Sequence, residues 1–384
     1  MANLFVIPKY IFTGKDALNL ASDNIKKLGK KALIVTDDMM VKLGSVKRLT
    51  DLLDSISVNY EIYSKVNSEP TDKMVSEGIE IYKNDNCNFL IAVGGGSPID
   101  TMKAIGAMIT NTGKITDYLG KVIPNDPPPL VTIPTTAGTG SEATQFTIIA
   151  DTEKNIKMLL KGPNLMSTIA IVDPVFTSTA PPKVTAATGI DALTHAIESY
   201  TSRKAQPMSN IFALSAVKRI FKNLLRAYKN GDDMTARTEL SIAALEAGIA
   251  FNNASVTIVH GMSRPIGALY HVPHGLSNAM LLSECLKFAL LGAPEKFCDL
   301  ASEIGGYKEG MSYIQAGKVF VGEVEKLCKS LDIQTLEEFG VNKGLFFKNL
   351  DKMTEDALAS GSPQNTIRIP SSEDIKDIYK ALWK

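Results

Sequence analysis

The first half of the chain alternates short apolar runs with amphipathic segments, and this alternation limits the possible folds more than any other feature. The runs are apolar at nearly every position, which is typical of strands covered by helices on both faces. The segments between them have helical periodicity, and Thr71, after Pro70, is a candidate cap for one of these helices. The expected strands are 32–36, 89–93 and 130–133, and the expected helices are 16–28, 46–55 and 71–85. This order predicts an α/β domain with a doubly wound, mostly parallel sheet.

The pattern changes near residue 180. Two further apolar runs, 147–150 and 169–172, are expected to complete the α/β domain, and the proline-rich segment 174–182 then indicates a boundary. Beyond it the β-branched runs nearly vanish, and stretches with helical periodicity follow at 184–201, 208–230, 236–252, 275–290 and 316–330. A chain of 384 residues also exceeds what one hydrophobic core usually serves. We therefore expect an α/β domain over residues 1–180 and an all-α domain over residues 181–384.

Charge and composition argue against several classes of protein. The chain has 41 basic and 41 acidic residues, so its net charge does not indicate nucleic acid or an anionic membrane as a partner. It lacks an apolar window of about 18 residues, so no membrane span is expected. Its four cysteines are scattered and form no CxxC pair, which favours reduced thiols. The N-terminus has too short an apolar run for a signal peptide, and we expect a cytoplasmic protein.

All four histidines of the chain, at positions 195, 260, 271 and 274, fall within about 80 residues of the second half. A single histidine is more often a core or surface residue than a ligand, but clustering weakens that interpretation. Asp191 and His195 are four residues apart, so on a helix they share one face and can share an ion. Taken alone, the pair could equally stabilise a helix. Together with His260 and His274 it forms a donor set that suits iron(II), zinc or another divalent transition metal.

The neighbours of these candidate ligands give further expectations. A glycine follows each of the last two candidates directly, Gly261 and Gly275, which indicates crowded backbone near a site. Pro265 and Pro273 are expected to interrupt helices and orient loops. Glu198 is a further carboxylate candidate, although its position on the helix would equally suit exposure to solvent.

Two loops in the first half have the composition of a phosphate-binding cradle. Gly94, Gly95, Gly96 and Ser97 come directly after an expected strand and open an expected helix, whose N-terminus would favour a diphosphate. The alternative is a tight turn that binds nothing. The run 134–142 combines glycines with small hydroxyl residues after the next strand, at the sheet edge where open α/β folds bind ligands.

Asp37 follows the first of the expected strands directly. A carboxylate at this position can accept hydrogen bonds from both ribose hydroxyls of an adenosine and would repel a 2′-phosphate, so NAD is favoured over NADP. The alternative role is that of a helix cap, and Asp38 could take either part.

Together these motifs resemble the iron-containing (group III) alcohol dehydrogenases, relatives of lactaldehyde reductase and 1,3-propanediol dehydrogenase. The likeness runs from the segment 11–14 through both loops to 189–199 and 250–282, and is weaker after about residue 300. It implies a dehydroquinate synthase-like fold, iron bound by Asp191, His195, His260 and His274, and a homodimer or larger homo-oligomer. It places cofactor contacts on Asp37, Gly96, Ser97, Thr135, Thr136, Gly138, Thr139 and Lys157, and the substrate beside Phe251 and Phe146.

The chain departs from the family pattern at two positions. Many members have a further histidine four positions after the third ligand, where this chain has Arg264, so His271 is the remaining imidazole for proton relay. Before the Pro70-Thr71 pair, Glu69 stands where the family often has asparagine, so no cofactor contact is assigned to it.

The resulting hypothesis is a metal-dependent alcohol dehydrogenase or aldehyde reductase that transfers hydride between NAD(H) and a small primary alcohol, diol or aldehyde. The ion would polarise the substrate oxygen. The nearest alternatives are a zinc-dependent polyol dehydrogenase, a dehydroquinate synthase or a maleylacetate reductase of the same architecture. A metal-dependent hydrolase would use the same ligands, but the glycine loop and Asp37 disfavour it. A non-enzymatic scaffold would leave both polar constellations unexplained.

Overall fold

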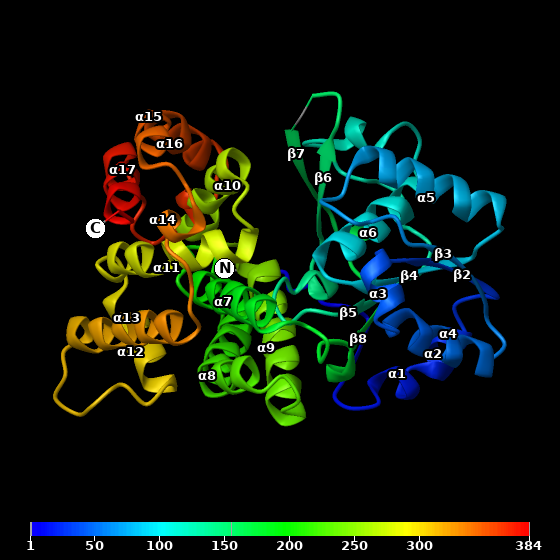
Figure 1. Ribbon diagram of the computed structural model, residues 1–384, viewed down its shortest axis with the longest axis horizontal. Helices are drawn as coiled ribbons and strands as arrows, with labels where there is room; N and C mark the ends of the chain where they lie inside the picture. Colours follow the sequence, from blue (N-terminus) through cyan, green and yellow to red (C-terminus); the bar gives the residue numbers. More distant parts are fainter. Residues whose placement is uncertain (1, 155, 384) are drawn as a thin grey trace. The chain divides into compact units, whose positions relative to one another are not determined.

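The computed structural model describes residues 2–154 and 156–383, which form two compact units (Figure 1). The α/β unit comprises Val6–Ala180. The helical unit comprises the residues from Pro181 onward together with the first few residues of the chain. The proline-rich segment therefore lies where one unit ends and the other begins.

Six parallel strands form the sheet of the α/β unit, in the order β1-β8-β5-β4-β2-β3. They are β1 (Tyr10–Thr13), β2 (Lys31–Val35), β3 (Asn59–Tyr63), β4 (Phe89–Gly94), β5 (Leu130–Pro134) and β8 (Ile169–Val172). The chain leaves β2 for β3 towards one edge and leaves β4 for β5 towards the other. The order of the strands thus reverses between β2 and β4, which is the topological switch point of a doubly wound sheet.

Helices cover both faces of this sheet, which explains why its central strands are apolar at every position. Leu33 and Val35 of β2 face a core shared with α5 and α6, whereas Ala32 and Ile34 face a second core shared with α1, α2 and α4. These helices are α1 (Ala17–Leu20), α2 (Ser22–Lys26), α4 (Ser45–Ser55), α5 (Asp72–Asn84) and α6 (Gly96–Thr110), and the short α3 (Asp38–Lys42) precedes α4. Thr71 caps α5, with its side chain accepting from the Met74 amide.

Two parts of this unit differ from the sequence-based expectation. The expected helix 16–28 is interrupted at Ala21, whose amide lies 3.1 Å from the Ala17 oxygen and 3.2 Å from the Leu18 oxygen, a tightened turn between α1 and α2. The run 147–150 does not extend the parallel sheet. It belongs to β6 (Phe146–Asp151), which pairs antiparallel with β7 (Ile156–Lys161) in a separate two-stranded sheet.

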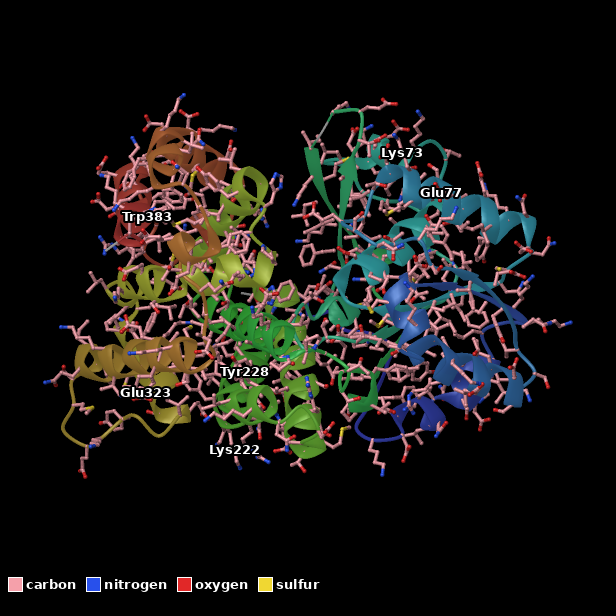
Figure 2. All side chains as sticks on the ribbon, viewed as in Figure 1. Lys73, Glu77, Lys222, Tyr228, Glu323 and Trp383 are labelled. Atoms are coloured by element: carbon pink, nitrogen blue, oxygen red, sulfur yellow. The ribbon has the colours of Figure 1, made fainter. Side chains whose placement is uncertain are left out.

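The helical unit contains the five expected helices and several more. Its helices are α7 (Pro182–Tyr200), α8 (Pro207–Lys229), α9 (Met234–Ala254), α10 (Ile258–Tyr270), α11 (His274–Leu290), α12 (Pro294–Glu303), α13 (Tyr313–Ser330), α14 (Leu336–Phe339), α15 (Lys343–Lys348), α16 (Leu350–Ala359) and α17 (Ser372–Ala381). Half-buried Tyr228 of α8 donates to Asp332 at 2.9 Å, whereas Lys222 lies on the exposed side of the same helix (Figure 2).

The expectation for Pro265 was wrong, because α10 continues through it. A proline in a helix interior loses one backbone hydrogen bond at a cost of about 3 kcal/mol, and buried Met262 and Ile266 on either side hold the helix in the core. Pro273, by contrast, precedes α11 as expected. Backbone crowding was also expected at Gly261. A Cβ on Gly261 would come within 2.6 Å of Pro363, so the crowding is against Pro363 and not against a candidate metal ligand.

The first residues of the chain belong to the helical unit rather than to the domain 1–180 expected from the sequence. The Leu4 carbonyl accepts a hydrogen bond from Gln206 at 3.1 Å, and the ring of Phe5 stacks on Phe212. In the segment that follows, β1 pairs with β8 on one side and forms an edge of the sheet.

Within residues 2–154 and 156–383, no single helix has the length and apolar character needed to cross a membrane. Among the described helices, the pair α9 and α10 taken together is long and apolar enough, but the two are bent by 104° at the break between them.

Candidate functional site

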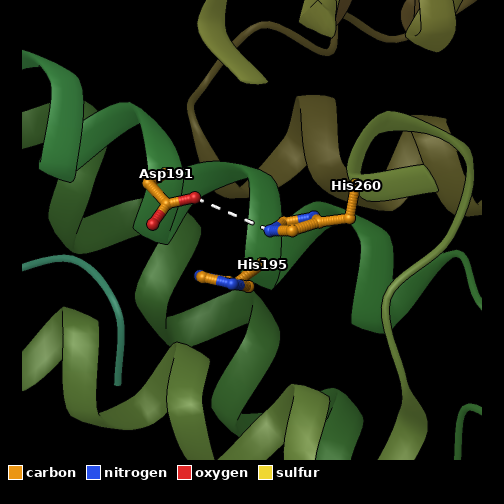
Figure 3. A group of neighbouring side chains, drawn as sticks. All are labelled: Asp191, His195 and His260. Atoms are coloured by element: carbon orange, nitrogen blue, oxygen red, sulfur yellow. Dashed lines mark ion pairs between the residues drawn. The ribbon is translucent and has the colours of Figure 1, made fainter. Parts of the chain in front are cut away.

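A group of possible metal ligands lies in the interior of the helical unit. Asp191 and His195 project from adjacent turns of α7, and His260 reaches them from α10 (Figure 3). One donor atom from each of the three lies within 4.8 Å of the others, and all three side chains are buried. The spacing of four residues on α7 thus brings the carboxylate and the imidazole together, as the sequence predicted.

His274, the fourth predicted ligand, lies at the start of α11. Its Nε2 is 3.7 Å from Asp191 Oδ1, close to the 3.6 Å that separates His260 Nε2 from the same oxygen. The backbone approaches closely here, since a Cβ on Gly275 would lie 2.6 Å from the Ala187 carbonyl oxygen on α7. Gly275 therefore lets the first turn of α11 lie against α7, and the crowding expected at this glycine is at the site.

Glu198 supports His260 from behind. Its Oε2 lies 2.5 Å from His260 Nδ1, and its Oε1 accepts from the Thr257 hydroxyl at 2.8 Å and the Val259 amide at 2.6 Å. Because a carboxylate can only accept, Nδ1 carries the proton and Nε2 presents its lone pair to Asp191 and His274 when the ring is neutral. Glu198 is thus buried in the site and not exposed to solvent.

The ionised Asp191 and the neutral His195 suit a cation, whereas His260 must release a proton to bind one. Burial opposes ionisation of Asp191, but the surrounding histidines hold its pKa far below the usual value. Burial lowers the pKa of His195 to about 3, so this ring is neutral at physiological pH. For His260, burial works against the charge, whereas Glu198 and Asp191 raise the pKa to about 9.

A divalent ion fits these residues. One carboxylate and three imidazoles form a donor set typical of iron(II) and zinc. Within the described residues, His195 Nδ1 is buried and has no hydrogen-bond partner. An unpaired polar atom in a protein interior needs an explanation, and beside these other donor atoms a bound ion supplies one. The structure thus supports the ion expected from the sequence, while the role of each residue as a ligand remains a prediction.

Two other predicted residues of this unit have different positions. Phe251 of α9 stacks on His195, with 4.3 Å between the ring centroids. His271 ends α10 in the left-handed conformation, with φ of 56°, and its side chain is exposed. Arg264, one turn after His260, is mostly buried; burial lowers its pKa, and the charge of Glu198 partly offsets this effect.

The α/β unit has a pocket of about 540 Å³ at the carboxyl ends of its strands. Asp37 and Asp38 after β2, Asn67 and Ser68 after β3, and residues 95–98 after β4 line it, so it lies at the switch point between β2 and β4. Open α/β sheets bind ligands at this place.

The two acidic residues of this pocket have separate roles. Asp37 caps α3 through Oδ1, which accepts from the Met40 amide at 2.9 Å, and its Oδ2 accepts no hydrogen bond within the described residues. Asp38 is bound to Asn67 and Ser64 at 2.9 and 3.0 Å. Asp37 is therefore a helix cap that still has a carboxylate oxygen for a ribose hydroxyl.

The two predicted cofactor loops pack against each other. The Thr135 amide donates to the Gly94 carbonyl at 3.0 Å. A Cβ on Gly96 would lie 3.2 Å from the Thr139 methyl group, and one on Gly95 would lie 3.6 Å from the Thr136 side chain. The absence of side chains at 95 and 96 thus allows the threonine loop, in which Gly138 is buried, to approach the start of α6.

A buried lysine holds the far end of the threonine loop. Lys103 of α6 is fully buried, and its Nζ donates to the carbonyls of Ser141, Thr144 and Phe146 at 2.6, 2.7 and 3.1 Å. Two carboxylates lie nearby, the partly buried Asp100 and the buried Glu142. Asp100 accepts from the Ser141 hydroxyl at 2.6 Å, and burial raises the pKa of Glu142 to about 7 despite the charge of Lys103.

The remaining predicted residues of this unit lie on the small hairpin. Lys157 of β7 is exposed and forms an ion pair with Glu69, the residue to which no cofactor contact was assigned. Phe146 begins β6, with the Lys161 amine 5.3 Å from its ring centroid.

Comparison with known proteins identifies the family. Residues 8–174 match the model described as "Iron-containing alcohol dehydrogenase", and residues 185–383 match "Fe-containing alcohol dehydrogenase family, C-terminal". The chain belongs to the iron-containing alcohol dehydrogenase family. The resemblance inferred from the motifs is thereby confirmed.

Proteins named for different alcohols and aldehydes resemble the chain to a similar degree. It is 37% identical to a choline dehydrogenase of Bacillus subtilis over 94% of this chain and 91% of that protein. It is 36% identical to lactaldehyde reductase of Escherichia coli over the full length of both chains. A crystal structure of 1,3-propanediol oxidoreductase matches the whole chain with a TM-score of 0.96 at 33% identity. A sulfoacetaldehyde reductase from Bifidobacterium kashiwanohense, in complex with NAD+, matches with a TM-score of 0.89 at 26% identity over 100% of this chain and 99% of that one.

Sequence reasoning missed several residues of this iron-containing alcohol dehydrogenase. Asn278 lies within hydrogen-bond distance of three predicted ligands. It follows His274 by four residues, just as His195 follows Asp191, so helical periodicity could have revealed it. Lys103 and Glu142 gave no comparable signal, because their burial depends on the fold of the threonine loop.

Proposed function

We propose that the chain is an NAD-dependent alcohol dehydrogenase, acting in the other direction as an aldehyde reductase, on small primary alcohols, diols or aldehydes. The observation that carries the proposal is the convergence of Asp191 and three histidines in a chain of this family. Ligand roles for Asp191, His195, His260 and His274 are part of it. A pocket at the switch point, with Asp37 beside the glycine loop, supports NAD(H) as the second reactant.

The chemistry of the bound groups is general: a divalent cation acts as a Lewis acid towards a substrate oxygen, and a nicotinamide accepts or donates hydride. The protein supplies position and charge. Glu198 keeps the lone pair of His260 Nε2 directed inward. Phe251, stacked on His195, provides an apolar surface for a small substrate, and Phe146 is proposed as a second one. His271 is proposed to transfer the proton that accompanies hydride transfer, with water as its source.

In the α/β unit the two loops are proposed to hold the cofactor through backbone and hydroxyl donors. Gly94, Gly95, Gly96 and Ser97 would place the N-terminus of α6 against the diphosphate, and Thr135, Thr136, Gly138 and Thr139 would line its other side. Lys157 is assigned a cofactor contact on family resemblance, so it would have to exchange its ion pair with Glu69 for that contact. A 2′-phosphate would meet the carboxylate of Asp37, which favours NAD over NADP.

The setting of the enzyme is also part of the proposal. The scattered cysteines, none of them in a disulfide, favour a reducing compartment, the cytoplasm. The free edge of β1 and the apolar segment before it support a homodimer or larger homo-oligomer.

The test is NADH oxidation over a panel of short aldehydes, with iron(II) or zinc restored anaerobically to chelator-treated protein. His260→Ala should lose bound metal and activity together while keeping its circular dichroism spectrum. Lys222→Ala, on the exposed side of α8, is the control and should behave as wild type. Full activity of metal-free His260→Ala would overturn the proposal.

A further inference from the structure

Asn278 is not one of the predicted ligands, yet its side chain lies within hydrogen-bond distance of three of them. Its side chain is fully buried in α11, one turn after His274. Its Nδ2 is 2.7 Å from Asp191 Oδ1, 3.2 Å from His260 Nε2 and 3.2 Å from His274 Nε2. One amide group therefore contacts three of the four predicted ligands, and it does so at the atoms that would bind the ion.

These three contacts cannot all be full hydrogen bonds. An amide nitrogen carries two hydrogens and has no lone pair to accept with. The carboxylate is the nearest and the only ionised acceptor, and charge-assisted hydrogen bonds are the stronger ones, so it takes one hydrogen. When both imidazoles are neutral at Nε2, the second hydrogen is shared between these two nitrogens.

A cation at this site would change only part of the arrangement. Each imidazole Nε2 has a single lone pair, and a nitrogen that binds an ion can no longer accept from Asn278. A carboxylate oxygen has further lone pairs, so Asp191 Oδ1 can bind an ion and accept from Asn278 at the same time. The bond from Asn278 to Asp191 is thus the one that is compatible with metal binding.

We propose that Asn278 is a positioning residue of the metal site, which holds Oδ1 of Asp191 towards the histidines. This inference rests on the proposed ligand roles. Helix α11 would then support the site through two residues on one face: His274 as a ligand, and Asn278 as the residue that orients Asp191. Buried groups that orient metal ligands typically change metal affinity by about 10- to 100-fold when they are removed.

The test measures metal affinity and not turnover. Co²⁺ is titrated into chelator-treated wild type and Asn278→Ala, with binding followed by visible absorption, whose bands also report the arrangement of ligands. The dissociation constant should rise by about 10- to 100-fold, and the Co²⁺ spectrum should change. Asn278→Ser, which retains a shorter donor, should fall between the two proteins.

Asn223→Ala is the matched control, because Asn223 is a buried asparagine of α8 whose Nδ2 donates to the Arg219 carbonyl at 2.9 Å within its own helix. It should lose stability but keep wild-type affinity and spectrum. Unchanged Co²⁺ affinity in both Asn278 variants, or tighter binding, would overturn the inference; the serine variant decides if the alanine variant does not fold. Failure of the wild type to bind Co²⁺, Zn²⁺ or iron(II) would instead overturn the proposed function.

Discussion

The carboxylate of Glu198 determines which nitrogen of His260 faces the other candidate ligands. It accepts from Nδ1 and is itself held by the Thr257 hydroxyl and the Val259 amide. Carboxylates in this position fix the tautomer of a metal-binding histidine and increase the electron density on the coordinating nitrogen. The contribution of Glu198 to metal binding can be separated from its contribution to the fold.

Glu198→Gln should weaken metal binding by about 10-fold, because only one, neutral oxygen remains to accept from His260 Nδ1 or from the Val259 amide, and it polarises the ring less. Competition with a chelator of known affinity measures the change. Glu246→Gln is the control, since Glu246 is a largely buried glutamate of α9 that interacts with Ser215 and Arg219 instead of a histidine. Equal affinities in wild type and Glu198→Gln would contradict the role given to this carboxylate.

A second buried glutamate, Glu142, should make the stability of the protein depend on pH. Burial raises its pKa from 4.5 to about 7, and Lys103 offsets this only in part. The folded state then binds more protons than the unfolded state between about pH 4.5 and 7, so stability falls as the pH rises through this window. The full effect is about 3 kcal/mol.

Glu142→Gln keeps the shape of the protonated side chain and should remove this dependence. Urea unfolding of both proteins at pH 5 and pH 8 checks it: the variant should gain about 3 kcal/mol relative to wild type at the higher pH. The exposed Glu80→Gln on α5 should leave the pH dependence unchanged. Parallel stability curves for wild type and Glu142→Gln would show that Glu142 does not titrate in this way.

The sequence predicted the four candidate ligands because histidine is rare in this chain and clustered, and because Asp191 lies four residues before His195. For Asn278 the sequence offered only its spacing of four residues from His274, and for Lys103 it offered no signal. Asparagine and lysine are common on exposed helix faces, and only the packing of α11 against α7, or of the threonine loop against α6, shows that these two are buried. Their roles come from contacts between segments far apart in the chain.

At the scale of helices and strands, the local sequence pattern predicted an element correctly wherever that element packs against the core of its own unit. The strands β2, β4 and β5 were predicted because both faces of the sheet are covered, and the long helices α7, α8 and α9 because their periodicity is sustained. The errors occurred where tertiary packing overrides a local rule, as at Pro265 inside α10 and at Ala21 between α1 and α2. The run 147–150 was ambiguous because an apolar strand does not reveal which strand it pairs with.

Gly275→Ala tests the close approach of α11 to α7. The added methyl group would lie 2.6 Å from the Ala187 carbonyl oxygen, so α11 must shift, and with it His274 and Asn278. Overpacking of this kind costs about 1–3 kcal/mol, and we expect metal affinity to fall by about 10-fold, the lower end of the effect of disturbed ligand support.

Gly322→Ala is the matched control for this variant. A Cβ at Gly322 of α13 meets no heavy atom within 4 Å, so alanine should raise helix stability by up to about 1 kcal/mol and leave metal affinity unchanged. Thermal unfolding and Co²⁺ titration of the two variants give both quantities. Wild-type affinity in Gly275→Ala would show that the site tolerates movement of α11.

At the scale of the whole molecule, the two candidate sites lie in different units, and the sequence indicated this division through its change of pattern near residue 180. It could not show that Leu4 and Phe5 join the helical unit, because their contacts with Gln206 and Phe212 span about 200 residues of sequence. The α/β unit therefore begins only after these residues.

Because the two candidate sites lie in different units, we expect the metal ion and NADH to stabilise different parts of the chain. A ligand present at about 100 times its dissociation constant stabilises the state that binds it by about 2.7 kcal/mol. Hydrogen exchange followed by mass spectrometry should therefore show slower exchange in α7, α10 and α11 when metal is added to chelator-treated protein. NADH should slow exchange in segments 94–100 and 135–146 and around Asp37.

In His260→Ala the effect of metal should disappear while that of NADH persists, because Asp37 and both loops belong to the other unit. Loss of the NADH effect in His260→Ala would mean that the two sites are not independent in the way that this division requires.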